Sequence, residues 1–403
     1  MTDSISPDGA RPVLRLKPKA DARRLRHGHP WVYSDDIVAD RRARALAPGA
    51  LAVLQDADRT DIGLVTVNLE SRIGARMLDR DATATIDRDW IAARITMALA
   101  HRNRLFSAPF YRLIHAEADG MPGVVIDRFG DAAALQPNAA WADACAADFA
   151  AVLEELGIPH VLLTAGGRAR SAEGLTGETR WLTGGLEAPI PVPMNGATYL
   201  ADLAGGQKTG LYYDQRPNQA FVAGLSRGAR VLDVFSHVGG FGLAALAAGA
   251  TSTLAVDGSA PALALAARGA EAMGRAGDFS SRQGDAFDVM TALGEEGAIF
   301  DVVVADPPAF APAKPALTAG LRAYERVARL ATPLVAPGGY LTLCSCSHAA
   351  DLSKFHAACV RGIGRAGRAS QLIHTGFAGA DHPVHPQLAE TGYLKALTFR
   401  LLP

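Results

Sequence analysis

The chain has 403 residues, of which 49% are hydrophobic and 20% are charged, so it can form two or three packed domains and is not a disordered protein. Forty basic and forty-one acidic residues give a net charge of −1, which excludes a globally basic nucleic-acid binder but leaves room for a local basic patch. Four cysteines do not make a disulfide scaffold, and the first residues lack the apolar segment of a secretory signal. We therefore expect a cytoplasmic protein with reduced thiols and no membrane segment.

The first part of the chain is locally basic. Between Arg11 and Arg44 there are ten Lys and Arg residues and four Asp residues. Short β-like runs follow at residues 50–54, 62–68 and 74–78, separated by turn sequences. This pattern predicts a small β-rich domain over residues 1–82. A solvated face explains the charge excess as well as a binding surface does.

The next part of the chain mixes helix and strand patterns. Apolar residues spaced near 3.6 predict a helix over residues 87–106. Strands are predicted at 111–115, 123–127, 132–135 and 160–163, and a second helix at 139–156. We expect a middle α+β domain over residues 83–199.

The last part of the chain alternates apolar strands with alanine-rich helices. Strands are predicted at 231–235, 253–257, 301–306 and 340–345, and helices at 240–249 and 261–273. This βαβ series predicts an α/β domain over residues 200–403, with a parallel sheet covered on both faces. Two final strands, at 371–374 and 393–401, flank a long loop without a good helix, and we expect them to pair antiparallel at one edge.

A glycine loop follows the first strand of this domain. Residues 231–242 read VLDVFSHVGGFG, and glycines allow the backbone and a helix N-terminus to approach a ligand. The G-x-G-x-x-G spacing is absent, which counts against a nicotinamide cofactor. Asp257 ends the next strand, fifteen residues after Gly242, where a carboxylate can accept hydrogen bonds from both hydroxyls of a ribose. A helix cap or turn residue is the structural alternative.

Two further acidic positions follow strands of the same sheet. Asp285 and Ala286 come after the third strand and could form hydrogen bonds with the edge of an adenine ring. A helix N-cap is equally expected at this position. Asp306, Pro307, Pro308 and Phe310 end the fourth strand, where the prolines stiffen the backbone around a carboxylate. Phe310 could stack on a base that has been flipped out.

The cysteines are assigned by their positions. Cys346 follows the fifth strand and is a candidate nucleophile, which needs local activation because an ordinary thiol is only slightly ionised at neutral pH. Cys344 fits a buried strand position, and Cys145 and Cys359 fit the packed faces of helices. A C-x-C pair without a second ligand cluster is poor zinc spacing, so no metal site is predicted.

In their order, the motifs of the chain resemble those of the RlmI-type family of 23S rRNA cytosine-C5 methyltransferases. Besides the glycine loop, DPPAF and SCS, the segments that carry the resemblance are residues 29–34 (HPWVYS), 117–123 (EADGMPG), 127–130 (DRFG), 206–216 (GQKTGLYYDQR) and 381–384 (DHPV). The resemblance implies an N-terminal PUA domain, a middle domain and a C-terminal Rossmann-like class I methyltransferase sheet. It implies S-adenosylmethionine as cofactor and 23S ribosomal RNA as partner.

The resemblance also implies roles for residues. Cofactor-binding residues are expected at Lys208, Thr209, Asp233, Phe235, Ser236, Gly239, Gly240, Asp257, Asp285 and Ala286. Substrate contacts are expected at Pro307, Pro308 and Phe310. Cys346 would add to C6 of cytosine, and Asp306 would hold or protonate N3. His237 and Val238 depart from the family pattern in the glycine loop.

Other functions stay open at the level of sequence. Methylation of an adenine or guanine amino group uses a related D/N-P-P-aromatic motif, but here Ala309 separates the prolines from Phe310. A non-catalytic RNA-binding factor on the same fold is a second alternative, and a nicotinamide dehydrogenase is a third. The oligomeric state also stays open, with a homodimer as one alternative.

Overall fold

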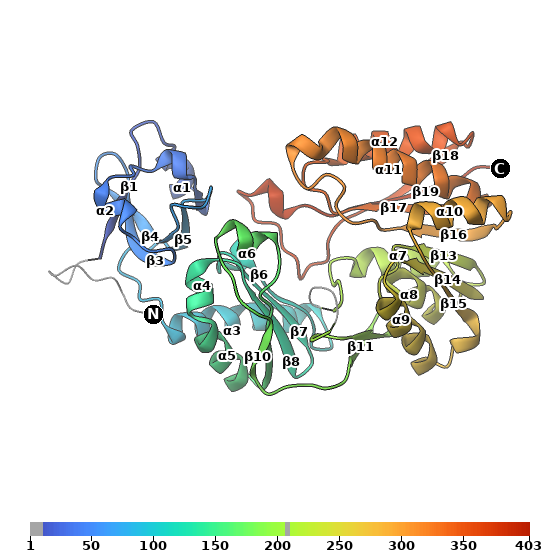
Figure 1. Ribbon diagram of the computed structural model, residues 1–403, viewed down its shortest axis with the longest axis horizontal. Helices are drawn as coiled ribbons and strands as arrows, with labels where there is room; N and C mark the ends of the chain where they lie inside the picture. The colour runs from blue at the N-terminus through green and yellow to red at the C-terminus, as the bar shows by residue number, and fades with distance from the viewer. Residues whose placement is uncertain (1–10, 206–209) are drawn as a thin grey trace. The chain divides into compact units, whose positions relative to one another are not determined.

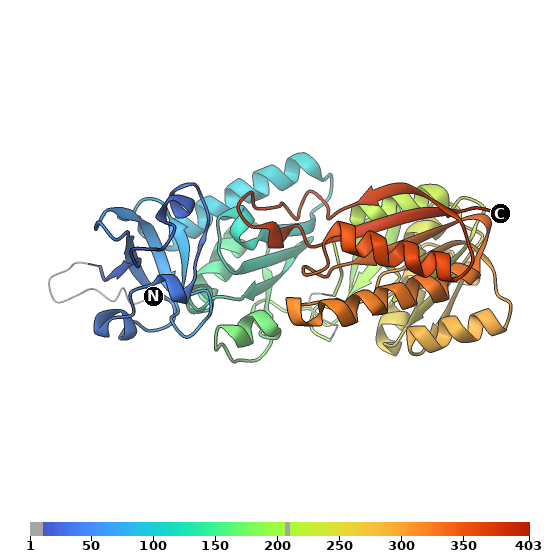
Figure 2. The same ribbon diagram turned by 90° about the horizontal axis from the view of Figure 1, so that it is seen from above.

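The computed structural model describes residues 11–205 and 210–403. Its contacts divide the chain into two compact units, which are described separately here. Unit 1 comprises Met1–Glu187 and Pro383–Ala389, and unit 2 comprises Ala188–His382 and Glu390–Pro403. The predicted domain boundaries after residues 82 and 199 stay predictions. Figure 1 and Figure 2 show the helices and strands from two directions.

Unit 1 begins with a small five-stranded sheet in the order β1-β3-β4-β5-β2. Its strands are β1 (Val13–Arg15), β2 (Trp31–Val32), β3 (Ala50–Gln55), β4 (Asp61–Val67) and β5 (Ala75–Asp79), with short helices α1 (Ala22–Arg26) and α2 (Arg41–Arg44). The three predicted strands are confirmed to within a residue at either end. Leu14, Leu54 and Val65 are fully buried in its core. This confirms the predicted β-rich N-terminal fold.

A second five-stranded sheet in unit 1 has the order β10-β9-β8-β7-β6. Its elements are α3 (Arg88–Leu105), β6 (Phe110–His115), β7 (Val124–Phe129), β8 (Ala132–Pro137), α4 (Ala140–Ala144), α5 (Ala146–Glu155), β9 (His160–Leu163), α6 (Arg168–Ala172) and β10 (Arg180–Thr183). Helix α3 begins after Asp87, whose carboxylate accepts the amide of Trp90 at 2.9 Å. The single helix predicted at 139–156 is wrong, because α4 and α5 are separate helices. Cys145 lies at that break, buried in the core.

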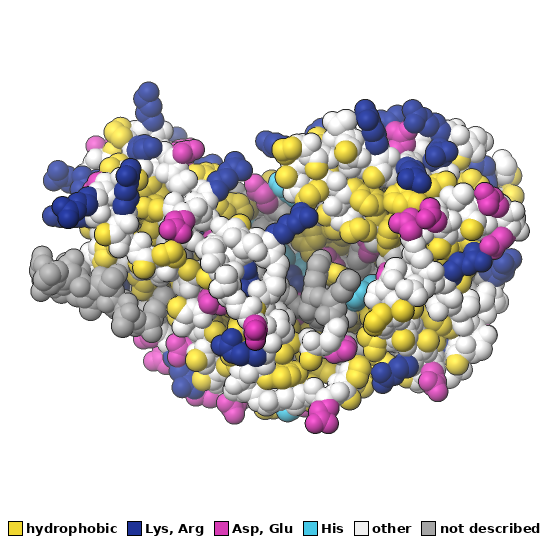
Figure 3. All heavy atoms as spheres, viewed as in Figure 1, with side chains coloured by type: hydrophobic (Ala, Val, Ile, Leu, Met, Phe, Trp, Pro, Cys, Tyr) yellow, Lys and Arg dark blue, Asp and Glu magenta, His cyan; other side chains and the backbone are white. Residues whose placement is uncertain are grey.

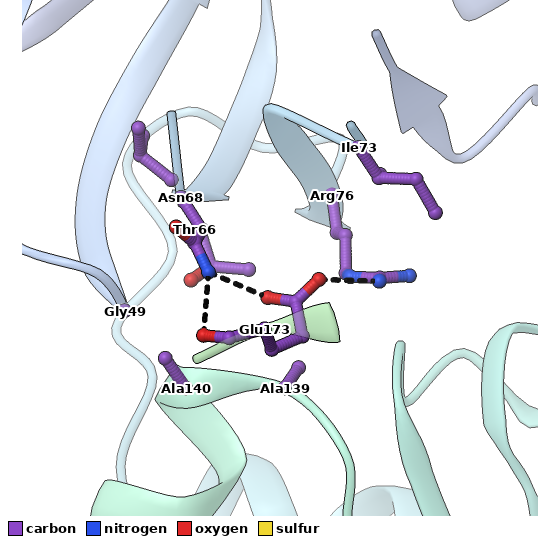
Figure 4. Close-up of a pocket in the computed structure, with 9 residues that line it drawn as sticks. Gly49, Thr66, Asn68, Ile73, Arg76, Ala139, Ala140 and Glu173 are labelled. Carbon is purple, nitrogen blue, oxygen red and sulfur yellow. Dashed lines mark hydrogen bonds and ion pairs between the residues drawn. The ribbon is translucent and has the colours of Figure 1, made fainter. Parts of the chain in front are cut away.

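Buried charged side chains join the two sheets of unit 1. Glu117 accepts hydrogen bonds from the Trp31 indole at 2.8 Å and from Arg76 at 2.9 Å, so it brings two of the quoted sequence motifs together. Arg76 also pairs with Glu173 at 2.8 Å. Glu173 in turn accepts a hydrogen bond from Asn68 at 2.9 Å, at a small pocket shown in Figure 4. Both acids at this junction and the two terminal nitrogens of Arg76 are therefore paired with groups from another part of the unit.

Unit 2 contains a hairpin and a seven-stranded sheet in the order β15-β14-β13-β16-β17-β19-β18. The hairpin strands are β11 (Ile190–Met194) and β12 (Ala197–Ala201), and the sheet strands are β13 (Arg230–Val234), β14 (Ser252–Asp257), β15 (Phe279–Gln283), β16 (Phe300–Ala305), β17 (Val335–Ser345), β18 (Ser370–Gly376) and β19 (Lys395–Leu401). Strands β13 to β17 are parallel. Strand β19 pairs antiparallel with β17 and β18, so the predicted antiparallel pair of final strands is confirmed.

Helices cover both faces of this sheet, as predicted. They are α7 (Arg216–Leu225), α8 (Gly240–Ala247), α9 (Ala260–Ala272), α10 (Ala286–Glu295), α11 (Leu317–Ala331) and α12 (Leu352–Arg365). Helices α7, α8 and α9 pack together on one face, and α10, α11 and α12 on the other (Figure 1). Across the described residues, no helix combines the length and the apolar character needed to cross a bilayer.

The strand order of unit 2 positions a ligand site. From β13 the chain builds outward to β14 and β15 on one side, and then returns to the other side with β16 and β17. In open α/β sheets, ligands bind at the carboxyl ends of the strands where the order reverses. The order reverses between the paired strands β13 and β16, so a ligand site is expected in the loops that follow these two strands.

Candidate active site

The candidate residues of unit 2 lie at one edge of the sheet. Val234 is in register with Val256 on β14 and with Ala305 on β16. The next residues along the three strands are Phe235, Asp257 and Asp306, so parallel pairing alone places these three side by side. Asp285 follows β15, and Cys346 follows β17, at the same edge. The structure thus brings together the candidates from all five parallel strands.

The glycine loop after β13 has an unusual backbone. Phe235 and His237 have φ of +61° and +50°, and Gly239 has φ of +82°. A positive φ is costly for a residue with a side chain, and such strain persists where the surroundings enforce it, often at ligand sites. Here the amide of Ser236 bonds to the carbonyl of Val256 at 3.0 Å, and the amides of Gly239 and Gly240 turn back to the carbonyl of Ser236. The loop is therefore tightly coiled before α8 begins.

Asp233 supports this loop from below. Its side chain is fully buried, and its Oδ2 accepts the backbone amides of Phe241 and Gly242 at 3.2 and 2.8 Å. Burial raises the pKa of Asp233 to about 7, although both amides oppose the shift. The residue therefore holds the start of α8 in place. A direct contact with the cofactor stays a prediction.

Asp257 is held in a position that suits a diol. Its Oδ2 accepts the amide of His237 and its Oδ1 accepts the amide of Ser259, both at 2.8 Å. A carboxylate has about four acceptor sites, so capacity remains for hydroxyl groups. The side chain is half-buried and tied to the glycine loop. Both the turn role and the ribose role considered from the sequence are therefore compatible with one geometry.

Asp285 caps a helix, as the alternative interpretation of the sequence expected. Its Oδ1 accepts the amides of Phe287 and Asp288 at 2.9 and 3.3 Å, so it is the N-cap of α10. Ala286 is buried beside it. The proposed contact with an adenine edge stays a prediction.

The loop after β16 carries the Asp306 motif. Asp306 is half-buried, and its amide bonds to the carbonyl of Val234 at 3.1 Å, which joins this loop to the end of β13. Pro307 is buried, whereas Pro308 is exposed. The ring of Phe310 lies 5.1 to 6.4 Å from the rings of three neighbours, Phe235, Phe287 and Tyr324. These contacts give Phe310 a packing role, and stacking on a flipped base stays a prediction.

Cys346 lies in the loop after β17, between two buried serines. It is half-buried, whereas Cys344, Cys145 and Cys359 are 2% exposed or less. Burial raises the pKa of Cys344 well above that of an ordinary thiol, so this residue packs, as predicted. Ser347 is anchored through its hydroxyl, which accepts the amide of Ala311 at 2.9 Å and bonds to the Tyr324 hydroxyl at 2.6 Å.

Lys395 and Ser347 are site residues that the sequence analysis missed. Lys395 is 4% exposed on β19, and its Nζ donates to the carbonyls of Ser347 and Ala350 at 2.7 Å each. Its signal was available, because the chain contains six lysines against 34 arginines and this one lies within the largely apolar strand predicted at 393–401. Ser347 carried no comparable signal, since one serine beside a cysteine indicates no role by itself.

The described residues fit an S-adenosyl nucleoside. Ser236 Oγ and Gln219 Oε1 are buried and lack a hydrogen-bond partner within the described part of the chain, and both belong to the glycine loop and its neighbour α7. A Cβ on Gly240 would lie 2.9 Å from Gln219 Nε2, so the loop is packed closely there. Buried polar atoms of this kind need a partner, which a bound ligand can supply. Lys208 and Thr209 lie outside the described residues.

The described ranges contain no group of three or more His, Cys, Asp or Glu residues arranged to hold a metal ion.

Comparisons with known proteins identify the family. A family model described as S-adenosylmethionine-dependent methyltransferase matches residues 160–400, and one described as PUA-like domain matches residues 14–80. The chain is 33% identical over 402 residues to ribosomal RNA large subunit methyltransferase I of Shewanella frigidimarina, across 96% of this chain and 99% of the relative. The chain belongs to the RlmI-type family of ribosomal RNA large subunit methyltransferases. A further family member, from Deinococcus radiodurans, is 32% identical over 417 residues, across 98% and 99% of the two chains.

Solved structures confirm the fold expected of an RlmI-type chain. A putative SAM-dependent methyltransferase from Streptococcus mutans matches with a TM-score of 0.80 and 18% identity, covering 96% of this chain and all of that one. A putative methyltransferase complexed with SAH matches with a TM-score of 0.81 and 18% identity. The cofactor is S-adenosylmethionine, as predicted.

Proposed function

We propose that the protein methylates C5 of a cytosine in 23S ribosomal RNA, through a covalent bond between Cys346 and C6 of the base. The observation that carries this proposal is the position of Cys346. Cys346 is half-buried and follows the carboxyl end of β17, where ligands bind in such sheets, whereas the other three cysteines are buried. A thiol at this edge has no function in amino-group methylation, but it is what an unreactive pyrimidine carbon requires.

The proposed chemistry divides between two residues. The Cys346 thiolate adds to C6, so that a C–S bond forms and electron density shifts to C5, while Asp306 holds N3 and supplies the proton that N3 takes up. When bound, S-adenosylmethionine would supply an electrophilic methyl group to C5, with the bond from that methyl to the sulfonium sulfur breaking so that the sulfur becomes a neutral thioether. A base then removes the C5 proton, the bond from C6 to sulfur breaks, and the N3 proton returns to Asp306. The thiolate is regenerated, and one methyl group replaces one proton.

Three observations support RNA as the substrate. The matched relatives are named as ribosomal RNA large subunit methyltransferases, and the N-terminal sheet matches a PUA-like model. Helices α11 and α12 also carry exposed arginines: Arg322, Arg326, Arg329, Arg361 and Arg365. Figure 3 shows Lys and Arg side chains in dark blue on the surface of the protein. Guanidinium groups match phosphate oxygens in shape and charge.

The test compares two cysteine variants on naked 23S rRNA. We expect Cys346→Ala to lose methyl transfer by at least about 1000-fold, because nothing else supplies the C6 nucleophile. Cys344→Ala is the matched control, since Cys344 lies two residues away and is buried. Cofactor binding to each variant shows that the fold is intact.

Mass mapping of the RNA product distinguishes the alternatives. A methyl group on C5 of cytosine supports the proposal, and RNA containing 5-fluorocytidine should trap the protein covalently at Cys346. Full activity of Cys346→Ala, or a methyl group on an adenine or guanine amino group, would overturn it. A protein that binds RNA but transfers no methyl group would instead be a binding factor.

A further inference from the structure

A buried lysine lies beside the candidate nucleophile. Lys395 on β19 is in register with Ser345, the last residue of β17 before Cys346. Its Nζ donates hydrogen bonds of 2.7 Å to the carbonyls of Ser347 and Ala350, which lie just beyond the cysteine. An ammonium at 4% exposure is costly unless polar groups compensate for lost water. Here two carbonyls compensate in part, and they tie the cysteine loop to the sheet.

Cys346 is one of the ionisable groups in the surroundings of the Lys395 ammonium. Two ionisable groups interact electrostatically with the ammonium, namely Cys346 and Asp351. Asp351 forms its ion pair with Lys354 and is half exposed to solvent, where its field is screened. The thiol of Cys346 is therefore the less screened of the two partners. Burial lowers the pKa of Lys395 to about 8, which still leaves the ammonium largely protonated at neutral pH.

We propose that Lys395 is a positioning residue that holds the loop of Cys346 and favours the thiolate form of its sulfur. This inference rests on the proposed function, since it explains how the Cys346 thiol becomes ionised enough to attack C6. A cation next to a cysteine is a common means of lowering the pKa of the thiol. The negative charge of the thiolate in turn favours the charged form of the ammonium, so the two groups titrate as a coupled pair.

Two further described groups that interact with Cys346 do not supply a positive charge. Tyr324 of α11 and Cys344 of β17 interact electrostatically with Cys346, and burial raises the pKa of both, so both are neutral at pH 7. Asp306 after β16 has an acidic group whose charge acts on Cys344. An acid disfavours a thiolate nearby, which makes a buried cation bonded to the same loop more important.

The first experiment needs no variant of Lys395. The alkylation rate of the full-length protein by iodoacetamide is measured from pH 5 to 10, and the rate of Cys346→Ser is subtracted to remove any background from the three buried cysteines. We expect the midpoint of this profile to lie below the ordinary thiol pKa of about 8.5, so that Cys346 is alkylated about tenfold faster at pH 7 than an ordinary thiol. A profile with an ordinary or raised thiol pKa overturns the proposal.

The second experiment separates charge from hydrogen bonding. Lys395→Gln keeps N–H donors but removes the charge, so we expect its alkylation rate at pH 7 to fall about tenfold and its profile to move to higher pH. Lys395→Arg restores the charge and should recover most of the shift. Lys19→Gln, which removes an exposed lysine of unit 1, is the control and should match the wild type. If the Gln and Arg variants show the wild-type profile, Lys395 has no influence on the thiol.

These measurements do not depend on the RNA reaction. If Cys346→Ala retained full methyl transfer, the proposed function would fail, whereas the alkylation profile would still report whether Lys395 favours the thiolate. If methyl transfer needs Cys346 but the profile of Lys395→Gln is unchanged, the proposed function stands and the role of Lys395 fails. The two failures are therefore distinguishable.

Discussion

The hydroxyl of Ser347 accepts the backbone amide of Ala311 at 2.9 Å, and this hydrogen bond joins the loop that carries Asp306 to the loop that carries Cys346. The same hydroxyl bonds to Tyr324 of α11 at 2.6 Å. Ser347 is fully buried, so both interactions are shielded from water. The parallel pairing of β16 with β17 sets the spacing between the acid and the thiol of the proposed site, and this serine side chain adds a second link between their loops.

Ser347→Ala should weaken catalysis more than cofactor binding. The substitution leaves the Ala311 amide and the Tyr324 hydroxyl without this partner, which costs about 1–3 kcal/mol when the group is buried. We expect methyl transfer to fall about tenfold or more, while the affinity for S-adenosylmethionine changes less than about threefold. The control is Ser226→Ala, since Ser226 is equally buried but its hydroxyl bonds to the carbonyl of Val222 within α7. Equal effects of the two substitutions would contradict a role specific to these loops.

Gly320→Ala should disturb the Asp306 loop from the helix behind it. A Cβ on Gly320 of α11 would lie 2.7 Å from the carbonyl oxygen of Phe310 and 2.7 Å from Cβ of Ala311, and contacts this short force neighbours to shift. We expect a loss of about 1–3 kcal/mol in stability, measured by thermal denaturation, and reduced methyl transfer. Gly364→Ala in α12 is the control, because a Cβ there meets nothing within 4 Å. That variant should be unchanged or slightly more stable, since alanine favours helix.

Asp257→Asn should lower the affinity for S-adenosylmethionine by about 10- to 100-fold, because hydrogen bonds to a charged group contribute about 1.5–3 kcal/mol. Calorimetric titration measures this loss. Asp301→Asn is the control, since its carboxylate accepts the amide of Arg230 at 2.8 Å near the opposite end of the same sheet. An unchanged affinity in Asp257→Asn would remove Asp257 from the cofactor site.

Asp233 should give the protein a distinct dependence on pH. Its pKa is raised to about 7 in the folded state from an ordinary value of 3.8, so between these values the folded state binds more protons than the unfolded state. Stability from this group is therefore present below about pH 4 and declines as pH rises to 7, by up to about 1.4 kcal/mol per pH unit. Asp233→Asn carries no such charge.

Thermal denaturation of both proteins from pH 4 to 8 isolates this effect. The melting temperature of Asp233→Asn relative to the wild type should rise steadily with pH across this range. A difference that stays constant would show that the Asp233 carboxyl does not titrate there.

Regular elements with clear end signals could be predicted from sequence. Residues 160–163 form β9 as predicted, and the helix predicted at 87–106 differs from α3 by one residue at each end because Asp87 is a real N-cap. The break at Cys145 could not be predicted, since no glycine or proline marks it and packing of two short helices decides it. Strand β17 begins at Val335 rather than at residue 340, because Val335 already pairs with Phe300 of β16, ahead of the turn-like residues Pro337, Gly338 and Gly339. The register shifts across these residues before Tyr340 pairs with Val302.

The sequence could predict those residues of the candidate site that directly follow a strand. Asp257, Asp306 and Cys346 follow parallel strands, and parallel pairing brings such positions to one edge. Lys395 and Ser347 contribute through β19 and through a contact with Ala311, 36 residues away in sequence. Interactions of that range depend on the folded geometry, so the sequence can mark Lys395 as an unusual residue but cannot indicate which loop it contacts.

The buried ion pairs of Arg76 have a consequence for synthesis of the chain. During translation, Glu173 is added to the chain 97 residues after Arg76. At elongation rates of about 5–20 residues per second, the delay is about 5–20 s. Until then the N-terminal sheet has emerged with a cation whose second counter-charge has not yet been translated. The N-terminal sheet can therefore reach its final structure only after α6 and the residues that follow it have been synthesised. The two sheets of unit 1 are thus expected to complete their folding together.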